Sequence, residues 1–241
     1  MVMGMNAIGY DVFSLGNHEF NYGMDNLNNV VSQANDNLDV LCANLYKDGK
    51  RVYEGYTTRE IEGVEVALIG VVSPHIMKWD SENLKGYEAK NPAEEVGFVI
   101  DEIENRPEGG ADVYAVVSHV GLESEYGNGD SARAIAEMNP EVSAIVAGHS
   151  HTNVPEEKIN NAVISQPTSN GQMVSKIELT VRKNGEKVEV VDKKSKLLST
   201  KGVAEDQKIN DLLANFHNTA IADATAPVGE MVGGILLIKM K

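Results

Sequence analysis

Histidines occur in three places where an apolar run gives way to a short polar cluster. The clusters are Gly16-Asn17-His18-Glu19, Ser118-His119 and Gly148-His149-Ser150-His151. Neutral imidazoles together with an amide oxygen suit a divalent ion of the first transition row, and the nitrogen donors favour Mn, Fe, Co or Zn over Mg or Ca. If the fold brings the three clusters together, they can form a metal site.

The elements that would position these clusters are strands that alternate with helices. Short apolar runs predict strands over residues 11–15, 39–43, 64–72, 112–118 and 142–147, and amphipathic stretches predict helices over residues 23–34, 92–104 and 131–138. This pattern favours an α/β layered domain. Because the carboxyl ends of strands open into a common crevice in such folds, the three histidine clusters can converge although they lie far apart in the sequence.

The pattern changes after His151. Residues 162–166, 174–182 and 187–197 alternate like strands of an antiparallel segment, with a hairpin turn over residues 183–186, and a helix follows over residues 205–222. We expect a catalytic domain over residues 1–204, and over residues 205–241 a linker helix and the start of a further domain. Residues 1–10 look like a late helical turn and residues 233–241 look severed, so we expect the chain to be an interior part of a longer protein.

Composition excludes several classes of function. The chain has 241 residues, of which 42% are hydrophobic and 24% charged, which is enough for a sizeable core. Its 36 acidic and 21 basic side chains give a net charge of −15, which repels duplex nucleic acid. We find no stretch of about 18 apolar residues that could span a membrane. The single cysteine, Cys42, lies in an apolar run and is expected to be a small buried side chain.

Other catalytic patterns fail on inspection. His18 and Glu19 do not begin a zinc-protease helix motif, because the position four residues after His18 is Tyr22. No serine lies in a Gly-x-Ser-x-Gly elbow, and there is no Walker-type Gly-x4-Gly-Lys sequence. Residues 127–129 are interpreted as a flexible turn, and His75 and His217 as structural histidines.

In their order and context, the histidine clusters resemble the later motifs of the calcineurin-like metallophosphoesterases. Residues 16–25 and 70–80 resemble, more narrowly, bacterial 2',3'-cyclic-nucleotide 2'-phosphodiesterases that also act as 3'-nucleotidases, and 5'-nucleotidases are close relatives. The resemblance covers roughly residues 1–225. It implies an α/β/β/α sandwich, which we expect to be incomplete at its N-terminus. It also implies that the further domain expected to begin within residues 205–241 is a C-terminal nucleotide-binding domain, most of which is missing.

The resemblance also implies roles for individual residues. In the family, two metal ions are bridged by an aspartate and a water. The resemblance places Asn17, His119 and His149 on one ion and His151 on the other. His18 would then face the phosphate, and Glu19 is a candidate to orient it. Two ions in this arrangement activate a hydroxide for attack on phosphorus and neutralise the non-bridging oxygens.

The sequence departs from the family pattern before Asn17. The family begins with an Asp-x-His motif and a Gly-Asp motif, and neither precedes Asn17 here. Asp11 cannot replace the bridging aspartate, because six residues of strand place it about 20 Å from Asn17. We therefore expect two ions in the complete enzyme but at most one, weakly bound, in this chain, which should be inactive or nearly so.

The complete enzyme is expected to hydrolyse 2',3'-cyclic nucleotides and 3'-nucleotides. Two alternatives stay open: a 5'-nucleotidase of the same superfamily, and a non-catalytic domain that keeps the fold for binding. The expected partners are a small nucleotide substrate and, through exposed sheet edges, other copies of the chain. The resemblance implies a periplasmic, secreted or cell-wall location.

Overall fold

The computed structural model describes residues 1–127, 129–185, 187–227 and 229. Three predicted features lie partly or wholly outside these residues: the turns at 127–129 and 183–186, and the ending at 233–241. The chain divides into two compact units, Met1–Val203 and Ala204–Lys241, and each is described by itself. Among the described residues no helix combines the length and the apolar character needed to cross a bilayer.

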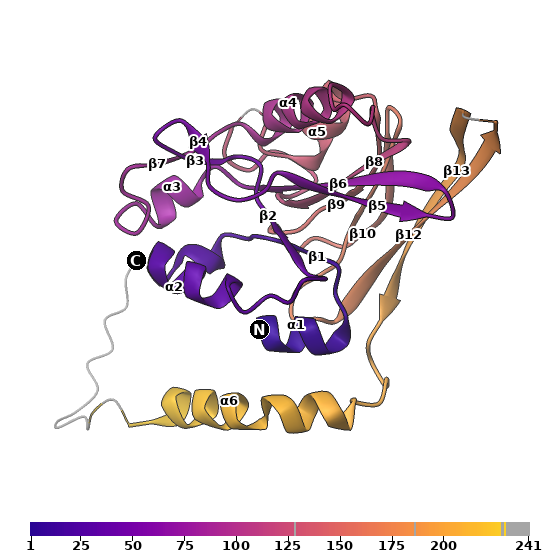
Figure 1. Cartoon of the computed structure of the whole chain (residues 1–241). Helices are drawn as coiled ribbons and strands as arrows, with labels where there is room; N and C mark the ends of the chain where they lie inside the picture. Colours follow the sequence, from indigo (N-terminus) through magenta and orange to yellow (C-terminus); the bar gives the residue numbers. More distant parts are fainter. Residues whose placement is uncertain (128, 186, 228, 230–241) are drawn as a thin grey trace, which may run out of the picture. The chain divides into compact units, whose positions relative to one another are not determined.

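A six-stranded mixed sheet forms the centre of the first unit (Figure 1). Its strands, in spatial order, are β10 (Val154–Ile159), β11 (Ala162–Gln166), β9 (Val142–Val146), β8 (Val113–His119), β6 (Val64–Val72) and β5 (Tyr56–Ile61). The four inner strands run parallel, whereas β10 and β5 pair antiparallel at the two edges. The prediction for residues 162–166 needs a correction, because β11 also joins the parallel part of the sheet. All five of its residues are buried, as expected for a strand that is covered on both faces.

Smaller strand groups surround this sheet. β1 (Val12–Ser14) pairs in parallel with β2 (Asp39–Leu41), and β3 (Leu45–Lys47) pairs with β4 (Lys50–Arg51) and β7 (Tyr87–Ala89). The contact between β2 and the central sheet is close at Gly70, where a Cβ would lie 2.5 Å from Leu41 Cβ. Glycine therefore permits the residues after β2 to cross β6, and Ala43 N donates to Gly70 O at 2.7 Å.

The helices of the first unit cover both sides of the strands. They are α1 (Val2–Ile8), the 3-10 turn η1 (His18–Phe20), α2 (Gly23–Val31), α3 (Ile76–Trp79), α4 (Pro92–Glu104) and α5 (Ala132–Met138). In Figure 1, α4 and α5 lie over one side of the six-stranded sheet, and β1, β2, α1 and α2 lie on the other. The layers follow the expected α/β/β/α order.

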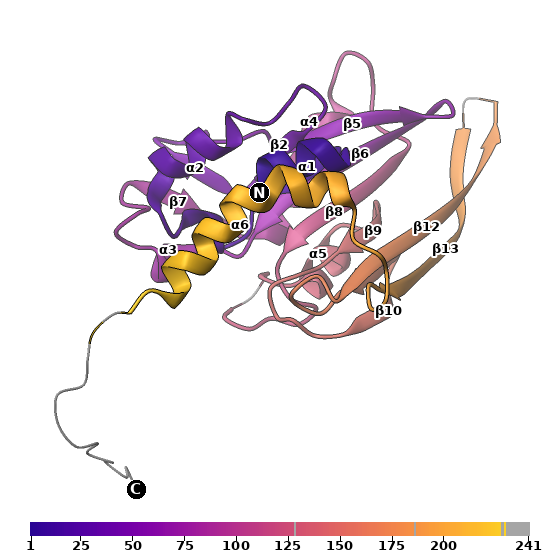
Figure 2. The ribbon, with the colours of Figure 1, turned by 90° about the horizontal axis from the view of Figure 1, so that it is seen from below.

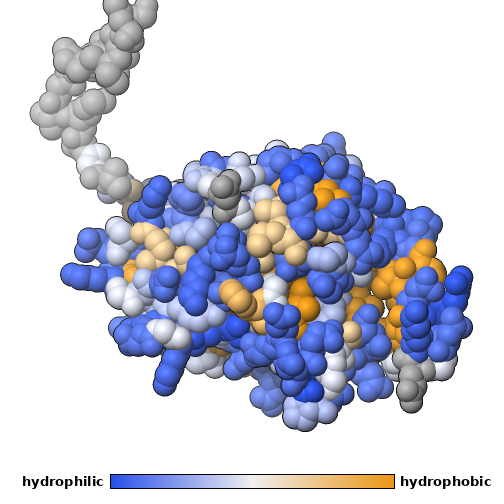
Figure 3. Space-filling model, turned by 90° about the horizontal axis from the view of Figure 1, so that it is seen from above, coloured by the Kyte–Doolittle hydropathy of each residue, from blue (hydrophilic) through white to orange (hydrophobic). Residues whose placement is uncertain are grey.

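Two buried clusters hold these layers together. One joins the central sheet to α4 and α5 and contains Ile69, Val99 and Ile135. The other joins β1, α2 and α3 and contains Phe13, Leu27 and Ile76, with Cys42 also buried. The face over α4 and α5 is largely hydrophilic, with several apolar patches (Figure 3).

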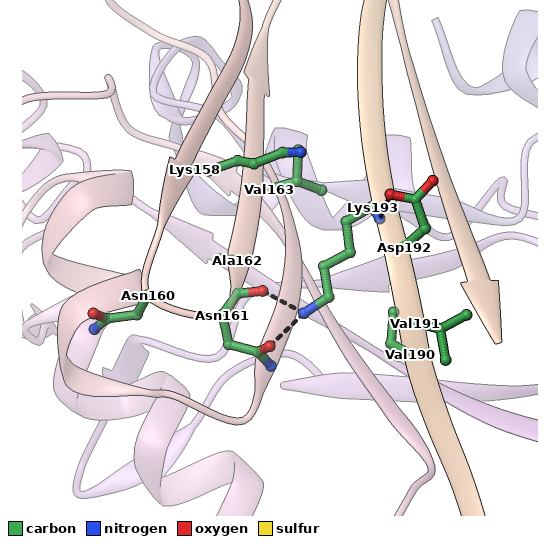
Figure 4. A pocket seen from close by; sticks show the side chains of 9 residues that line it. All are labelled: Lys158, Asn160, Asn161, Ala162, Val163, Val190, Val191, Asp192 and Lys193. Carbon is green, nitrogen blue, oxygen red and sulfur yellow. Dashed lines mark hydrogen bonds between the residues drawn. The ribbon is translucent and has the colours of Figure 1, made fainter. Parts of the chain in front are cut away.

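The strands β12 (Met173–Asn184) and β13 (Lys187–Ser199) form a long antiparallel pair (Figure 2). Lys193 attaches this pair to the turn between β10 and β11, where its Nζ donates to the backbone and side-chain oxygens of Asn161 (Figure 4). Burial lowers the pKa of the Lys193 amine. The pocket in Figure 4 contains none of the predicted site residues.

The second unit contains α6 (Gln207–Thr225). It begins at Asp206, whose carboxylate accepts hydrogen bonds from the backbone of Lys208 and Ile209. This cap satisfies amides that would otherwise lack partners at the start of the helix. The helix predicted over residues 205–222 therefore begins two residues later than expected and extends to Thr225.

Candidate metal site

The three histidine clusters lie at the ends of neighbouring strands. His119 is the last residue of β8, and His149 follows the end of β9, which runs parallel beside β8. Gly148 N donates to Val120 O at 2.9 Å and holds the two strand ends together. Asn17 lies between β1 and η1, and β1 packs across β8.

The side chains of Asn17, His119 and His149 meet. Asn17 Oδ1 lies 2.8 Å from His119 Nε2 and 3.3 Å from His149 Nδ1. The two imidazole rings have centroids 5.3 Å apart. Donor atoms that share one ion at roughly 2.0–2.2 Å lie about 3–3.5 Å apart in tetrahedral or octahedral geometry. The two distances from Asn17 are therefore close to those of ligands around a common divalent ion.

Both imidazoles are held in the neutral form that a metal ligand needs. Burial, aided by the neighbouring His149 and His18, lowers the pKa of His119 to about 4. Burial also lowers the pKa of His149, against the opposing effect of Glu125, whose Oε2 lies 3.7 Å from His149 Nε2. At neutral pH a ring nitrogen of each histidine is free to donate an electron pair.

Gly16 allows the close packing around His119. A Cβ at this position would lie 2.9 Å both from His119 Nδ1 and from Glu19 Oε2. Glu19 Oε2 accepts a hydrogen bond from Gly16 N at 2.8 Å, so this carboxylate shapes the turn that presents Asn17. The hydrogen-bond partner of His18 is Asn21, with His18 Nδ1 and Asn21 Oδ1 2.7 Å apart.

His151 is exposed beside the cluster. Its backbone φ is 54° and that of His149 is 64°, so both lie in the left-handed region that most residues avoid. No described hydrogen bond joins His151 to Asn17, and the described residues contain no group of three His, Cys, Asp or Glu side chains that could hold a metal. An amide and two imidazoles thus fit one ion.

An aromatic group that the sequence reasoning missed borders the cluster. His75, which was interpreted as structural, lies with its ring centroid 4.4 Å from that of Tyr126 and 5.8 Å from that of Trp79. Trp79 in turn stacks on His149. Trp79 and Tyr126 are 41% and 45% exposed, so they form a partly open wall beside His149. Their position could not be inferred locally, because it depends on how α3 lies against the segment that carries Tyr126.

The comparison with family models decides the assignment. The model described as calcineurin-like phosphoesterase matches residues 4–153, which is more than half of the chain and includes the three clusters. The chain belongs to this family. Calcineurin-like phosphoesterases bind divalent metals, which agrees with the donor set found here.

Proteins that are similar to this chain are named as enzymes that cleave nucleotides. The chain is 28% identical to the trifunctional nucleotide phosphoesterase protein YfkN of Bacillus subtilis, over 94% of this chain and 17% of that protein. It is 27% identical to a 2',3'-cyclic-nucleotide 2'-phosphodiesterase/3'-nucleotidase of Salmonella typhimurium, over 94% of this chain and 39% of that enzyme. This calcineurin-like phosphoesterase chain thus spans less than half the length of either relative.

The fold agrees with a solved structure of the same family. The crystal structure of calcineurin-like phosphoesterase YfkN from Bacillus subtilis superposes with a TM-score of 0.84 and 27% sequence identity, covering 93% of this chain and 75% of that one. The predicted α/β metallophosphoesterase fold is therefore confirmed.

Proposed function

We propose that this chain carries the metal-binding part of a phosphoester hydrolase for 2',3'-cyclic nucleotides and 3'-nucleotides. The observation that carries the proposal is the convergence of Asn17 Oδ1 with His119 Nε2 and His149 Nδ1. The choice of substrate is supported by the activity for which the Salmonella typhimurium relative is named.

Asn17, His119 and His149 would hold one divalent ion of the Mn, Zn, Fe or Co group through these three atoms. Bound there, such an ion lowers the pKa of a water ligand and neutralises charge on phosphate oxygens. The protein contributes ligands that need not lose a proton, because burial holds the pKa of both imidazoles below its ordinary value. His151 is the candidate ligand for a second ion.

In this proposal His18 would meet the phosphoester. It is exposed and directly follows Asn17, and its Nδ1 is already engaged by Asn21. The remaining ring nitrogen, Nε2, is the atom that would face a phosphate oxygen or the leaving oxygen, and it would donate a hydrogen bond or a proton there when the ring carries hydrogen on both nitrogens. Glu19 supports this arrangement indirectly, by fixing the turn at Gly16.

The same geometry argues for low activity of the chain by itself. Three neutral donors attract a dication less than a set that includes carboxylates. We infer that the chain binds at most one ion, weakly, and hydrolyses 2',3'-cyclic AMP or bis(p-nitrophenyl) phosphate negligibly in the presence of manganese.

The test is a titration of the chelator-treated chain with Mn²⁺, followed by the bound ion's electron paramagnetic resonance signal. The wild type should bind one ion, and Asn17→Ala and His149→Ala should lose that binding. His217→Ala, on α6, is the matched control and should bind as the wild type does. Two tightly held ions, no binding at all, or binding that survives both substitutions would contradict the proposal.

A 5'-nucleotidase is a second candidate, because a 5'-nucleotidase of Vibrio cholerae is 34% identical over 65% of this chain and 29% of that enzyme. Comparing release of phosphate from 3'-AMP and 5'-AMP distinguishes the two. If His18→Ala and His149→Ala abolish a measurable turnover of either substrate, the inference of low activity is wrong.

We also propose that copies of the chain associate with one another. Among the described residues β1 pairs only with β2, so its other edge offers unpaired backbone groups to a second copy. We expect light scattering to show association that increases with concentration, and a clean monomer at high concentration would contradict this. From the family resemblance we also propose a periplasmic, secreted or cell-wall location.

A further inference from the structure

A chain of hydrogen bonds leads from His18 to a buried carboxylate. His18 Nδ1 lies 2.7 Å from Asn21 Oδ1, and Asn21 Nδ2 lies 3.1 Å from each carboxylate oxygen of Asp80. Asp80 directly follows α3 and is only 8% exposed. The three residues come from two segments that are 59 positions apart.

The direction of these hydrogen bonds follows from the groups involved. A carboxylate only accepts hydrogen bonds, so Asn21 must turn its NH₂ group towards Asp80. The amide oxygen of Asn21 then faces His18, and because that oxygen also only accepts, His18 Nδ1 must carry the hydrogen. In a neutral ring with one hydrogen, the electron pair lies on Nε2.

A second set of contacts fixes the backbone of the same segment. Asn83 Nδ2 donates to Phe20 O and to Asn21 O, both at 3.0 Å, and approaches Asp80 Oδ1 at 3.4 Å. The 3-10 turn that carries His18 is thereby tied to the residues that follow α3. The backbone that carries His18 and Asn21 is therefore held by a side chain far from it in sequence.

We propose that Asp80, acting through Asn21, is a positioning residue that holds the neutral ring of His18 in the Nδ1–H tautomer. The consequence for the reaction rests on the proposed function: Nε2 becomes the ring atom of His18 that is available to the phosphoester. Nothing in the Gly16–Glu19 cluster itself would select this tautomer. The selection comes from the charge and burial of Asp80, transmitted by the fixed direction of one amide.

The experiment measures the tautomer directly. Long-range ¹H–¹⁵N correlation spectra of metal-free protein with ¹⁵N-labelled histidine are recorded at about pH 9, where an ordinary histidine ring is neutral. The His18→Gln spectrum assigns the signals of His18. We expect the wild type to show hydrogen on Nδ1. Hydrogen on Nε2 in the wild type would overturn the proposal without any variant.

The variants test the role of Asp80. Asp80→Asn allows the Asn21 amide to turn over, so His18 should show a mixture of tautomers. The double substitution Asn21→Asp with Asp80→Asn returns an acceptor-only group to His18 and should restore Nδ1–H. Asp25→Asn, an exposed change on α2, is the control and should match the wild type. A tautomer that is unchanged in Asp80→Asn would overturn the proposal. Because the spectrum requires neither bound metal nor turnover, this result is independent of whether the proposed hydrolase function holds.

Discussion

The indole ring of Trp79 stacks on the imidazole ring of His149, with ring centroids 5.1 Å apart and an interplanar angle of 26°. Trp79 is the only tryptophan in the sequence. Its fluorescence therefore reports on one place in the molecule, the ring of a candidate metal ligand.

We predict that Co²⁺ quenches most of the Trp79 emission. A paramagnetic ion bound by His149 would be close to the indole ring, because the indole stacks on the imidazole that binds the ion. EDTA should restore the emission, and Asn17→Ala should abolish the quenching by removing the central donor atom. The measurement is a fluorescence titration. Quenching of equal strength and midpoint in Asn17→Ala would show that the ion binds elsewhere.

Glu125 should affect metal affinity although it is not a ligand. Its Oε2 lies 3.7 Å from His149 Nε2, on the side of the ring opposite the Nδ1 atom that faces Asn17. Carboxylates in this position orient a ligating histidine, and their loss weakens metal binding by about tenfold or more. We expect this loss for Glu125→Gln in a Mn²⁺ titration.

The control for this change is Glu123→Gln in the same loop, where the carboxylate pairs with Arg133 instead. Its affinity for Mn²⁺ should equal that of the wild type. Equal affinities for all three proteins would contradict a role for Glu125.

The lowered pKa of His119 predicts a loss of stability in acid. The native ring resists protonation down to about pH 4, whereas the unfolded chain takes up a proton near its ordinary pKa of 6.5. The stabilisation is therefore present above pH 6.5 and is lost as the pH falls from 6.5 towards 4. At pH 5 the loss amounts to about 2 kcal/mol.

Urea unfolding with a chelator present measures this loss. The free energy of unfolding of the wild type should exceed that of His119→Gln by less at pH 5 than at pH 7.5. His217→Gln should behave as the wild type at both values.

Cys42 should be unreactive in the folded chain. Burial raises the pKa of its thiol from 9.0 to about 12, so the nucleophilic thiolate is scarce at pH 8. We expect a thiol reagent to label the native protein very slowly and to label it fully in denaturant, as measured by mass spectrometry. Because the pKa is raised in the folded chain, the protonated thiol of Cys42 contributes to the free energy of unfolding below pH 9. This contribution is lost as the pH rises from 9 to 12. Rapid labelling under native conditions would contradict the buried position.

The elements with strong local signals could be predicted from the sequence. The helix α4 has its predicted bounds because Asn91 caps it and Pro92 suits its first turn, and β6 has its predicted bounds because it is a long apolar run. The edge strand β5 was missed, because its residues are only partly buried and lack a clear alternation. Short strands such as β4 offer too few residues for any pattern.

The candidate site likewise contains some contacts that could be predicted from sequence and others that could not. The proximity of His119 and His149 could be predicted from sequence, since each lies at or just after the end of a strand and neighbouring parallel strands end at one edge. Asn17 also follows a strand, but that strand belongs to a separate sheet, so its position depends on how the two sheets pack. The contact between Asn21 and Asp80 could not, because it depends on how the segment after α3 packs against the 3-10 turn. No spacing or composition signal records that packing.

The convergence of the metal donors also has a consequence for folding kinetics. Asn17 lies 102 residues from His119 and 132 residues from His149 along the chain, so the donors meet only after very long loops have closed. Contacts of such high sequence separation form slowly and late. If these contacts form after the folding transition state, an ion bound there should slow unfolding while leaving the folding rate nearly unchanged. The bound ion would then slow the separation of the assembled strands without speeding their assembly.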